Sequence, residues 1–189
     1  MISKRNFLLG AAAALALAPA NAVSAPRRKR QRFRLNPKYR PRVVSFSGYS
    51  PGTIVIDPRR HYLYLVLPGG RARRYGVGVG RAGRTFRGSA RIGRKAKWPA
   101  WTPTKNMIRR EPRKYARYAN GVPGGPGNPL GARALYLYQG DRDTMFRIHG
   151  TTEPWSIGRS VSNGCIRMLN SHVIDLYRRV APGTRVVVI

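Results

Sequence analysis

The chain has 189 residues, a length that suits one domain with appendages and excludes two domains of ordinary size. Its 37 lysine and arginine residues against six acidic residues give a formal net charge of +31, and such a surface attracts polyanions. This charge indicates nucleic acid, an anionic membrane surface or an acidic polymer as partner without distinguishing among them. The 42% of hydrophobic residues suffices for a packed core, and short runs of valine, isoleucine and tyrosine indicate a mainly β fold with a few short helices.

The N-terminal segment has the parts of an export signal. Lys4 and Arg5 precede an apolar run that starts at Phe7, and residues 20–22 (Ala-Asn-Ala) offer small side chains to a signal peptidase. The apolar run is too short to span a bilayer stably. We therefore expect residues 1–22 to be a signal peptide and the mature protein to act in the periplasm, by either the Sec or the twin-arginine route. A buried N-terminal helix is the alternative.

Export changes how the charge is interpreted, because chromosomal DNA is absent outside the cytoplasm, so we expect no nucleic acid as partner. Residues 26–42 hold nine basic residues and no acidic one. Such a run repels itself and buries little apolar surface. We expect residues 23–49 to form a basic flexible tether, which either attracts anionic envelope polymers or serves as a plain solvated linker. Residues 50–189 are the expected folded domain.

Strands dominate the predicted elements of this domain. Residues 53–80 indicate three strands joined by turns, and in the second strand both faces are apolar, which predicts that it is covered on both sides. Residues 81–130 are rich in glycine, proline and arginine, and we expect loops that line a site, with a short helix within 106–120. Two further strands are predicted at 134–139 and 145–150, a helix at 170–180 capped by Asn170 or Ser171, and a final strand at 184–189.

Cys165 is the only cysteine, and in an oxidising compartment it has no partner for an internal disulfide. It is therefore either a buried apolar filler or a reactive thiol. The three scattered histidines and one cysteine show no metal-ligand spacing, so neither a structural zinc nor a cofactor is expected.

A histidine next to a cysteine can take the thiol proton and favour the nucleophilic thiolate. His149 ends a predicted strand and is the best placed of the three histidines, and we expect it to form an ion pair with Cys165. The N–H groups of Gly164 and Cys165 are candidates for stabilising an oxyanion. Ser162 and Asn163 either bind substrate or hold the turn, and Arg167 either binds a substrate carboxylate or braces the loop.

The stretch "IHGTTEPWSIGRSVSNGCIRMLN" resembles the signature of the L,D-transpeptidase (YkuD-like) catalytic domain: a histidine followed by Gly-Thr, a variable stretch, then Ser-x-Gly-Cys-x-Arg. The resemblance extends from about Gly52 to Ile189. It implies a β-rich, partly barrel-like sandwich with a cysteine-containing cleft. Ser162, Gly164 and Arg167 match positions of the motif. Many members have histidine where this chain has Asn163, which puts in doubt any role of that position in holding the substrate.

The resemblance also implies a reaction on peptidoglycan stem peptides. Cys165 would attack the carbonyl that follows the third residue, at the L-centre of diaminopimelate, and expel the terminal D-amino acid. His149 would act as general base, and the main-chain carbonyl of Gly150 would orient its ring. The acyl-enzyme would pass the peptide to an acceptor amine, and carbapenem-type β-lactams would acylate Cys165.

The acceptor remains open. A second stem gives 3-3 cross-links, which we expect first, water gives L,D-carboxypeptidase action, and an amine on an envelope protein gives attachment of that protein to the wall. An interpretation of another class is a non-catalytic basic module that binds the cell wall and in which Cys165 is inert.

Overall fold

The computed structural model describes residues 33–82, 84 and 86–189. The expected signal peptide and the first part of the expected tether, residues 23–32, lie outside the described residues. Three short α-helices and three 3-10 helices accompany eleven strands in this part of the chain. The predicted mainly β class with a few short helices is confirmed. In chain order the elements are η1 (Pro37–Tyr39), β1 (Arg42–Ser45), β2 (Ile54–Asp57), β3 (Tyr62–Leu67), β4 (Arg71–Gly76), β5 (Val79–Gly80), β6 (Gly88–Lys97), α1 (Lys105–Arg110), α2 (Pro112–Tyr115), η2 (Ala116–Tyr118), β7 (Arg133–Gln139), β8 (Arg142–His149), η3 (Pro154–Ser156), β9 (Ser160–Ser162), β10 (Ile166–Arg167), α3 (Asn170–Arg179) and β11 (Arg185–Val188).

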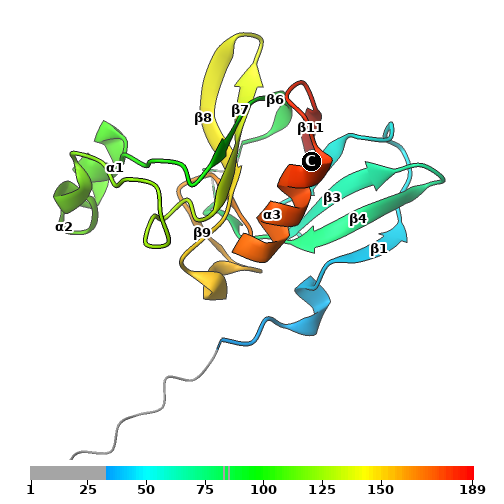
Figure 1. The fold of residues 1–189 in the computed structure, drawn as a ribbon, viewed down its shortest axis with the longest axis horizontal. Coiled ribbons are helices and arrows are strands. Elements are labelled where there is room, and N and C mark those ends of the chain that lie inside the picture. Colours follow the sequence, from blue (N-terminus) through cyan, green and yellow to red (C-terminus); the bar gives the residue numbers. More distant parts are fainter. Residues whose placement is uncertain (1–32, 83, 85) are drawn as a thin grey trace, which may run out of the picture. The chain divides into compact units, whose positions relative to one another are not determined.

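Nine of these strands form one mixed sheet in the order β1-β4-β3-β2-β11-β6-β7-β8-β10 (Figure 1). The C-terminal strand β11 lies between β2, to which it is parallel, and β6, to which it is antiparallel. The two halves of the sheet are thus joined by the last strand of the chain. The two-residue strand β10 lies beyond β8 and pairs with it in parallel. Strands β5 and β9 pair separately in a two-stranded sheet.

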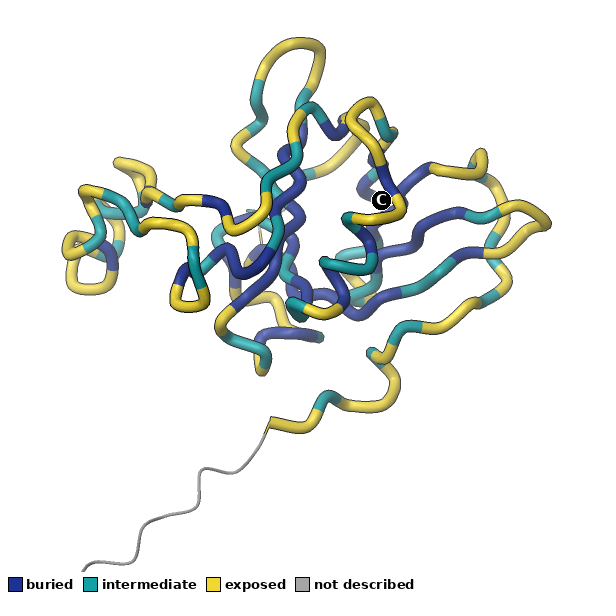
Figure 2. The backbone as a smooth tube through the Cα atoms, in the orientation of Figure 1, coloured by how far each residue is buried: buried dark blue, intermediate teal, exposed yellow. Residues whose placement is uncertain are grey.

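The main core lies between the sheet and helix α3, which crosses one of its faces (Figure 1). Val173 and Leu176 of α3 are fully buried against Leu135 and Ile148 of the sheet. Figure 2 shows that the central strands are buried, while the segment from α1 to α2 is largely exposed. No helix among the described residues is long and apolar enough to cross a membrane.

The second face of β3 is covered as well, by residues that precede Tyr49. Phe46 stacks on Tyr64 with ring centroids 4.3 Å apart, and Val44 packs against the same cluster. The prediction that β3 is covered on both sides agrees with this arrangement, in which Tyr64 is buried.

The expected tether, residues 23–49, differs from the structure in its second part. Residues 42–45 form strand β1, which pairs with β4, and η1 precedes it. Tyr39 occupies a niche over two glycines, since a Cβ at Gly76 or Gly158 would lie 2.3 Å from an atom of Tyr39. Order therefore begins before Tyr49, because Tyr39, Val44 and Phe46 pack against the folded domain.

Two helix predictions need correction in detail. The helix expected within 106–120 is divided at Glu111, and Pro112 opens α2. The helix expected at 170–180 is present, but the residue at its N-cap is Leu169 and no side chain caps it. Asn170 instead accepts a hydrogen bond from the Ala132 N–H at 3.0 Å and so ties α3 to the loop before β7.

Candidate active site

Strands β8 and β10 bring the predicted site residues together. In their parallel register Ile166 lies beside Ile148 and Arg167 beside His149. The two isoleucines are buried in the core. Because side chains alternate along a strand, His149 and Arg167 point to the opposite face, and Cys165, two residues before Arg167, shares that face. This pairing places a thiol, an imidazole and a guanidinium on one surface.

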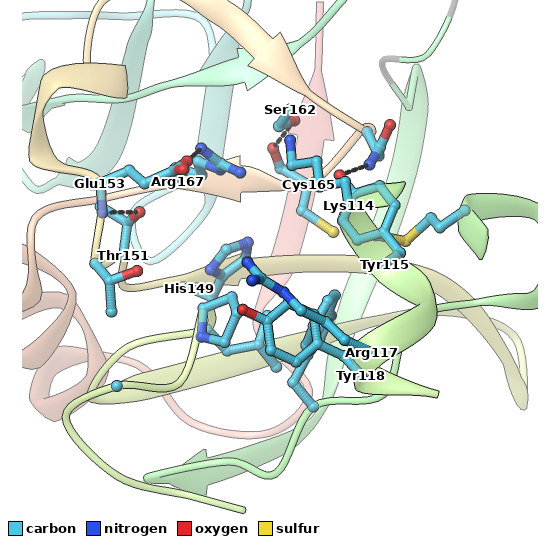
Figure 3. Close-up of a pocket in the computed structure, with 17 residues that line it drawn as sticks. Lys114, Tyr115, Arg117, Tyr118, His149, Thr151, Glu153, Ser162, Cys165 and Arg167 are labelled. Atoms are coloured by element: carbon cyan, nitrogen blue, oxygen red, sulfur yellow. Dashed lines mark hydrogen bonds and ion pairs between the residues drawn. The ribbon is translucent and has the colours of Figure 1, made fainter. Parts of the chain in front are cut away.

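These side chains line a cavity of about 270 Å³ (Figure 3). Cys165 and His149 both face it, and Arg167 and Glu153 lie on one side. The opposite wall comes from Trp101, from the segment of α1, α2 and η2, and from the loop before β7. Its lining residues are Trp101, Met107, Lys114, Tyr115, Arg117, Tyr118, Gly127, Pro129 and Leu130.

His149 is buried and held in one orientation. Its Nδ1 lies 2.5 Å from the carbonyl oxygen of Gly150. A carbonyl only accepts, so Nδ1 carries the proton and donates, and in the neutral ring Nε2 is left as an acceptor. Burial lowers the pKa of His149 to about 3, and the Arg167 and Arg147 cations add to this effect, whereas the Gly150 and Leu130 carbonyls oppose it. The imidazole is therefore neutral at pH 7.

Cys165 precedes β10 directly and is partly exposed. Burial raises the pKa of its thiol, while the backbone N–H of Arg147 and the Arg147 and Arg167 cations act in the opposite direction. A thiol with a raised pKa beside an imidazole with a lowered pKa favours the neutral pair. The structure thus differs from the expected ion pair, because the same burial that brings the two groups to the cavity penalises charge on both.

Ser162 holds the turn around the cysteine. Its hydroxyl donates to the carbonyl of Cys165 at 2.7 Å and accepts from the N–H of Gly164 at 3.0 Å. Of the two roles considered for Ser162, the structure shows this one. The N–H of Gly164 is therefore occupied, and the N–H of Cys165 is the better candidate for stabilising an oxyanion. The role of Gly164 in oxyanion binding stays a prediction.

Gly164 is fitted closely between two other parts of the chain. Its φ is +132°, and a Cβ would lie 2.5 Å from Cε1 of Phe146 and 2.6 Å from the carbonyl oxygen of Arg84. A side chain here would strain the backbone and also collide with its neighbours.

Asn163 connects two segments that flank the cavity. Its side-chain oxygen accepts from Nη1 of Arg84 at 2.7 Å, and its Nδ2 donates to the hydroxyl of Tyr115 at 2.9 Å. Tyr115 belongs to α2 and packs edge-on against Trp101. Asn163 therefore ties the cysteine loop to the helical wall, and substrate binding by Asn163 stays a prediction.

Arg167 braces a neighbouring loop. Its Nη1 lies 2.5 Å from Oε2 of Glu153, and its backbone N–H and carbonyl pair with Gly78. Of the roles considered for Arg167, bracing is visible in the structure, and its place in the cavity lining is compatible with contact to a substrate carboxylate.

A bulge in β8 also shapes the site. The register between β7 and β8 shifts between Tyr136 and Tyr138, and Met145 in the bulged part has a φ of +63°. The carbonyl of Met145 lies 3.9 Å from Sγ of Cys165. Two hydrogen bonds from Arg147 to Asp143, at 2.8 and 3.0 Å, close the bulge. Bulges of this kind often re-aim strands next to active sites.

Sequence reasoning missed the helical wall and the ion-pair partner of Arg167. Lys114, Arg117 and Tyr118 line the cavity, and Glu153 holds Arg167. Loops lining a site were expected within 81–130, but no motif there singles out these side chains. Among the described residues, no group of three His, Cys, Asp or Glu side chains is arranged to hold a metal ion.

Comparison with known proteins places these residues in a family. The model of the L,D-transpeptidase catalytic domain (YkuD) matches residues 51–188. "Probable L,D-transpeptidase ErfK/SrfK" of Escherichia coli (strain K12) is 34% identical over 139 residues, which are 72% of this chain and 43% of that protein. The chain thus spans less than half the length of this relative.

Solved structures show the same fold. A crystal structure from Brucella melitensis, named a probable carnitine operon oxidoreductase, is 59% identical and covers 82% of this chain and 96% of its own, with a TM-score of 0.57. The L,D-transpeptidase LdtMt1, in complex with imipenem, shares the fold at 18% identity and a TM-score of 0.51, with 72% of this chain and 58% of that chain covered. The family model covers most of the folded part, and its residues include the whole His149 and Cys165 motif. The chain belongs to the L,D-transpeptidase catalytic domain (YkuD) family.

Proposed function

We propose that this chain is an exported L,D-transpeptidase in which Cys165 forms an acyl-enzyme with a peptidoglycan stem peptide. The observation that carries the proposal is the arrangement of His149, whose Nδ1 is committed to Gly150 and whose Nε2 is left to accept a proton in the cavity that Cys165 lines. Three cations and one acid, Lys114, Arg117, Arg167 and Glu153, line that cavity, and this excess of positive charge suits a peptide rich in carboxylates.

The acylation step follows from the neutral pair. As Sγ attacks the carbonyl carbon after the third stem residue, the thiol proton passes to Nε2 of His149 and an oxyanion forms. The low pKa of His149 means that the imidazolium gives up this proton readily. The proton goes to the amine of the terminal D-amino acid as the C–N bond breaks, and a thioester remains on Cys165.

Transfer reverses these roles. An acceptor amine attacks the thioester carbonyl, His149 takes the amine proton, and the sulfur leaves and regains a proton. We propose a second stem peptide as the principal acceptor, which gives 3-3 cross-links. Transfer to an amine on an envelope protein, or to water, uses the same acyl-enzyme and is the alternative.

The reaction is tested by incubating the purified chain with disaccharide-tetrapeptide and analysing the products by mass spectrometry. We expect dimers with loss of a terminal D-amino acid. Tripeptide with free D-amino acid and no dimer would indicate water as the acceptor, and product only when an envelope protein is added would indicate attachment. Cys165→Ala is the control and should give no product.

A non-catalytic wall-binding module is the competing function. It predicts that the wild-type chain and Cys165→Ala bind peptidoglycan equally and that neither changes it. An adduct of imipenem on Cys165, seen by intact mass and absent from Cys165→Ala, would argue against this alternative. No adduct and no product would overturn the proposed enzyme.

We further propose that the chain acts in the periplasm after cleavage of residues 1–22, with the basic residues that follow attracting anionic envelope polymers. N-terminal sequencing of the cellular protein should begin at Val23. An intact N-terminus would overturn export and restore nucleic acid as a candidate partner.

A further inference from the structure

A second cavity, of about 350 Å³, lies at the C-terminal end of α3 and shares no lining residue with the first. Strands β6 and β7 form one side of it and α3 forms the other. We call it the α3 cation pocket and define it by its lining residues, Lys95, Lys97, Arg133, Tyr177 and Arg178. Four of the five carry a positive charge.

Two of these cations oppose each other directly. Lys97 of β6 and Arg133 of β7 are register partners in the antiparallel pair. Like charges at such positions destabilise a sheet unless an opposite charge lies between them. Lys97 and Arg178 are exposed at the rim of the pocket, where solvent alone reduces their repulsion.

The chain contains no acidic side chain that is free to neutralise the pocket. All six acidic residues lie within the described part, and each is ion-paired elsewhere. The partners are Arg60 for Asp57, Arg81 and Lys114 for Glu111, Arg91 for Asp141, Arg147 for Asp143, Arg167 for Glu153, and Arg73 and Arg179 for Asp175. No acidic side chain is therefore left unpaired to neutralise the pocket.

The inner part of the pocket is held in place. Nζ of Lys95 donates to the carbonyls of Tyr177 and Val180 at 2.8 and 2.5 Å, and it lies 4.2 Å from the centroid of the Tyr177 ring. Arg133 gives one N–H to the carbonyl of Ala132 at 2.6 Å and retains further donors in its guanidinium. Lys95 and Arg133 are thus each tied to backbone carbonyls at the inner part of the pocket.

We propose that the α3 cation pocket binds a phosphate group, as a phosphomonoester or a phosphodiester. Guanidinium groups bind phosphate oxygens in pairs, and lysine ammonium groups add point charges. The cavity of about 350 Å³ is large enough for such a group, and Lys97 of β6, Arg133 of β7 and Arg178 of α3 all line it. The site is separate from Cys165, and the proposal does not depend on the proposed function.

The test is to titrate the full chain with inorganic pyrophosphate and to measure binding by isothermal titration calorimetry. The pocket variant is the triple substitution Lys97→Gln, Arg133→Gln and Arg178→Gln. A control variant, Arg40→Gln, Arg42→Gln and Arg71→Gln, removes the same three charges from exposed positions that line neither cavity. Lys95 is kept in both, because its bonds hold α3.

We expect the pocket variant to bind pyrophosphate at least about tenfold more weakly than the wild type, since one charge-assisted hydrogen bond already corresponds to that factor. The control variant should stay within about twofold of the wild type. An equal loss of affinity in both variants would show that only net charge matters and would overturn the proposal. Undiminished binding by the pocket variant, or no binding by the wild type, would also overturn it. Thermal unfolding of both variants establishes that they are folded.

The source of the phosphate is resolved by a second set of measurements. Vesicles of phosphatidylglycerol mixed with phosphatidylcholine present the group as a lipid headgroup, and pyrophosphate presents it in solution. Vesicle binding that the pocket variant loses, that the control retains and that pyrophosphate competes away supports a lipid headgroup. Pyrophosphate binding with equal vesicle binding by both variants supports a soluble or polymeric phosphate.

Discussion

The sulfur of Cys165 and the ring of His149 lie in surroundings that oppose charge on either group. Burial raises the pKa of the thiol and lowers that of the imidazole to about 3. The cations Arg147 and Arg167 favour a thiolate but disfavour an imidazolium, so they stabilise the negative charge of the reaction without stabilising a resting ion pair. Proton transfer is thus expected to accompany attack on the substrate.

This electrostatic arrangement predicts the pH dependence of alkylation. Iodoacetamide reacts with the thiolate, so its rate with Cys165 should rise about tenfold per pH unit from pH 6 to above pH 9. His149→Gln should change this rate little, because a neutral imidazole does not increase the thiolate fraction, but should lower transpeptidation at least about 100-fold. The alkylation rate is measured by intact-mass spectrometry of samples quenched at successive times. A plateau that begins near pH 6 would instead establish an ion pair.

Gly164 is the residue whose replacement tests the packing of the cysteine loop. Gly164→Ala should destabilise the fold by about 1–3 kcal/mol and lower activity, because it adds a collision with Phe146 and Arg84 to the strain of positive φ. Gly183→Ala is the matched control, with φ +89° and open space around its Cβ. Urea unfolding of the two variants measures the difference. Equal destabilisation of the two variants would mean that the close packing around Gly164 does not contribute to the cost of the substitution.

The sequence predicted that His149 and Cys165 lie near each other, and both line one cavity, but it did not predict their charge states. The spacing of His149 and Cys165, with Gly164 beside the cysteine, follows a motif that is visible without a structure. The pKa values depend on the burial of both groups and on Arg147, whose position depends on the β8 bulge. No local pattern reports how many atoms surround a side chain.

At the scale of elements, the helical wall is held by few contacts. Segment α1 to η2 has one buried side chain, Tyr115, and its hydroxyl accepts from Asn163. Arg84 holds the other side of the same asparagine. Asn163 thus forms a direct link between the cysteine loop and this wall, beside the Arg81–Glu111 ion pair.

Asn163→Ala should release both contacts and raise the KM for the tetrapeptide about three- to tenfold, with a smaller effect on kcat, since one or two hydrogen bonds of about 1 kcal/mol are lost. Tyr115→Phe removes only the contact to the wall and should account for part of the increase. Steady-state kinetics of both variants measure the effect. An unchanged KM in both would show that the wall does not depend on Asn163.

The elements that could be predicted are those whose apolar residues recur with the period of a strand or a helix. The alternation in β2 and β3 and the helical spacing of α3 were sufficient to place them within a few residues. Strand β1 was missed, because it follows a run of basic residues and because Val44, like the neighbouring Phe46, is covered only by residues distant in sequence. The β8 bulge was missed because the residues on both sides of it favour a strand, so the sequence pattern does not show where the register shifts.

At the scale of the whole molecule, all three histidines make the folded state less stable as the pH falls. Burial lowers the pKa of His61, His149 and His172. The unfolded chain therefore binds more protons than the folded chain below about pH 6.5, and stability falls as the pH falls through this window. Above it the contribution of the histidines is fully present.

We expect the free energy of unfolding to decrease between pH 6.5 and pH 4 by on the order of 1 kcal/mol per pH unit from His149 alone. Urea unfolding at pH 7.5, 6.5, 5.5 and 4.5 measures the slope. His149→Gln should make it shallower. Burial alone would raise the pKa of Asp175, but hydrogen bonds from Tyr75, Arg73 and Arg179 lower it. Its effect on stability therefore falls at lower pH than that of the histidines. A slope that is the same in both proteins would contradict this prediction.

The two-residue pairing of β10 with β8 has a consequence for chain length. Adding or removing one amino acid between Ser162 and Ile166 would turn the thiol into the hydrocarbon interior and expose an isoleucine in its place. An insertion or deletion of one residue beside the cysteine should therefore inactivate the protein.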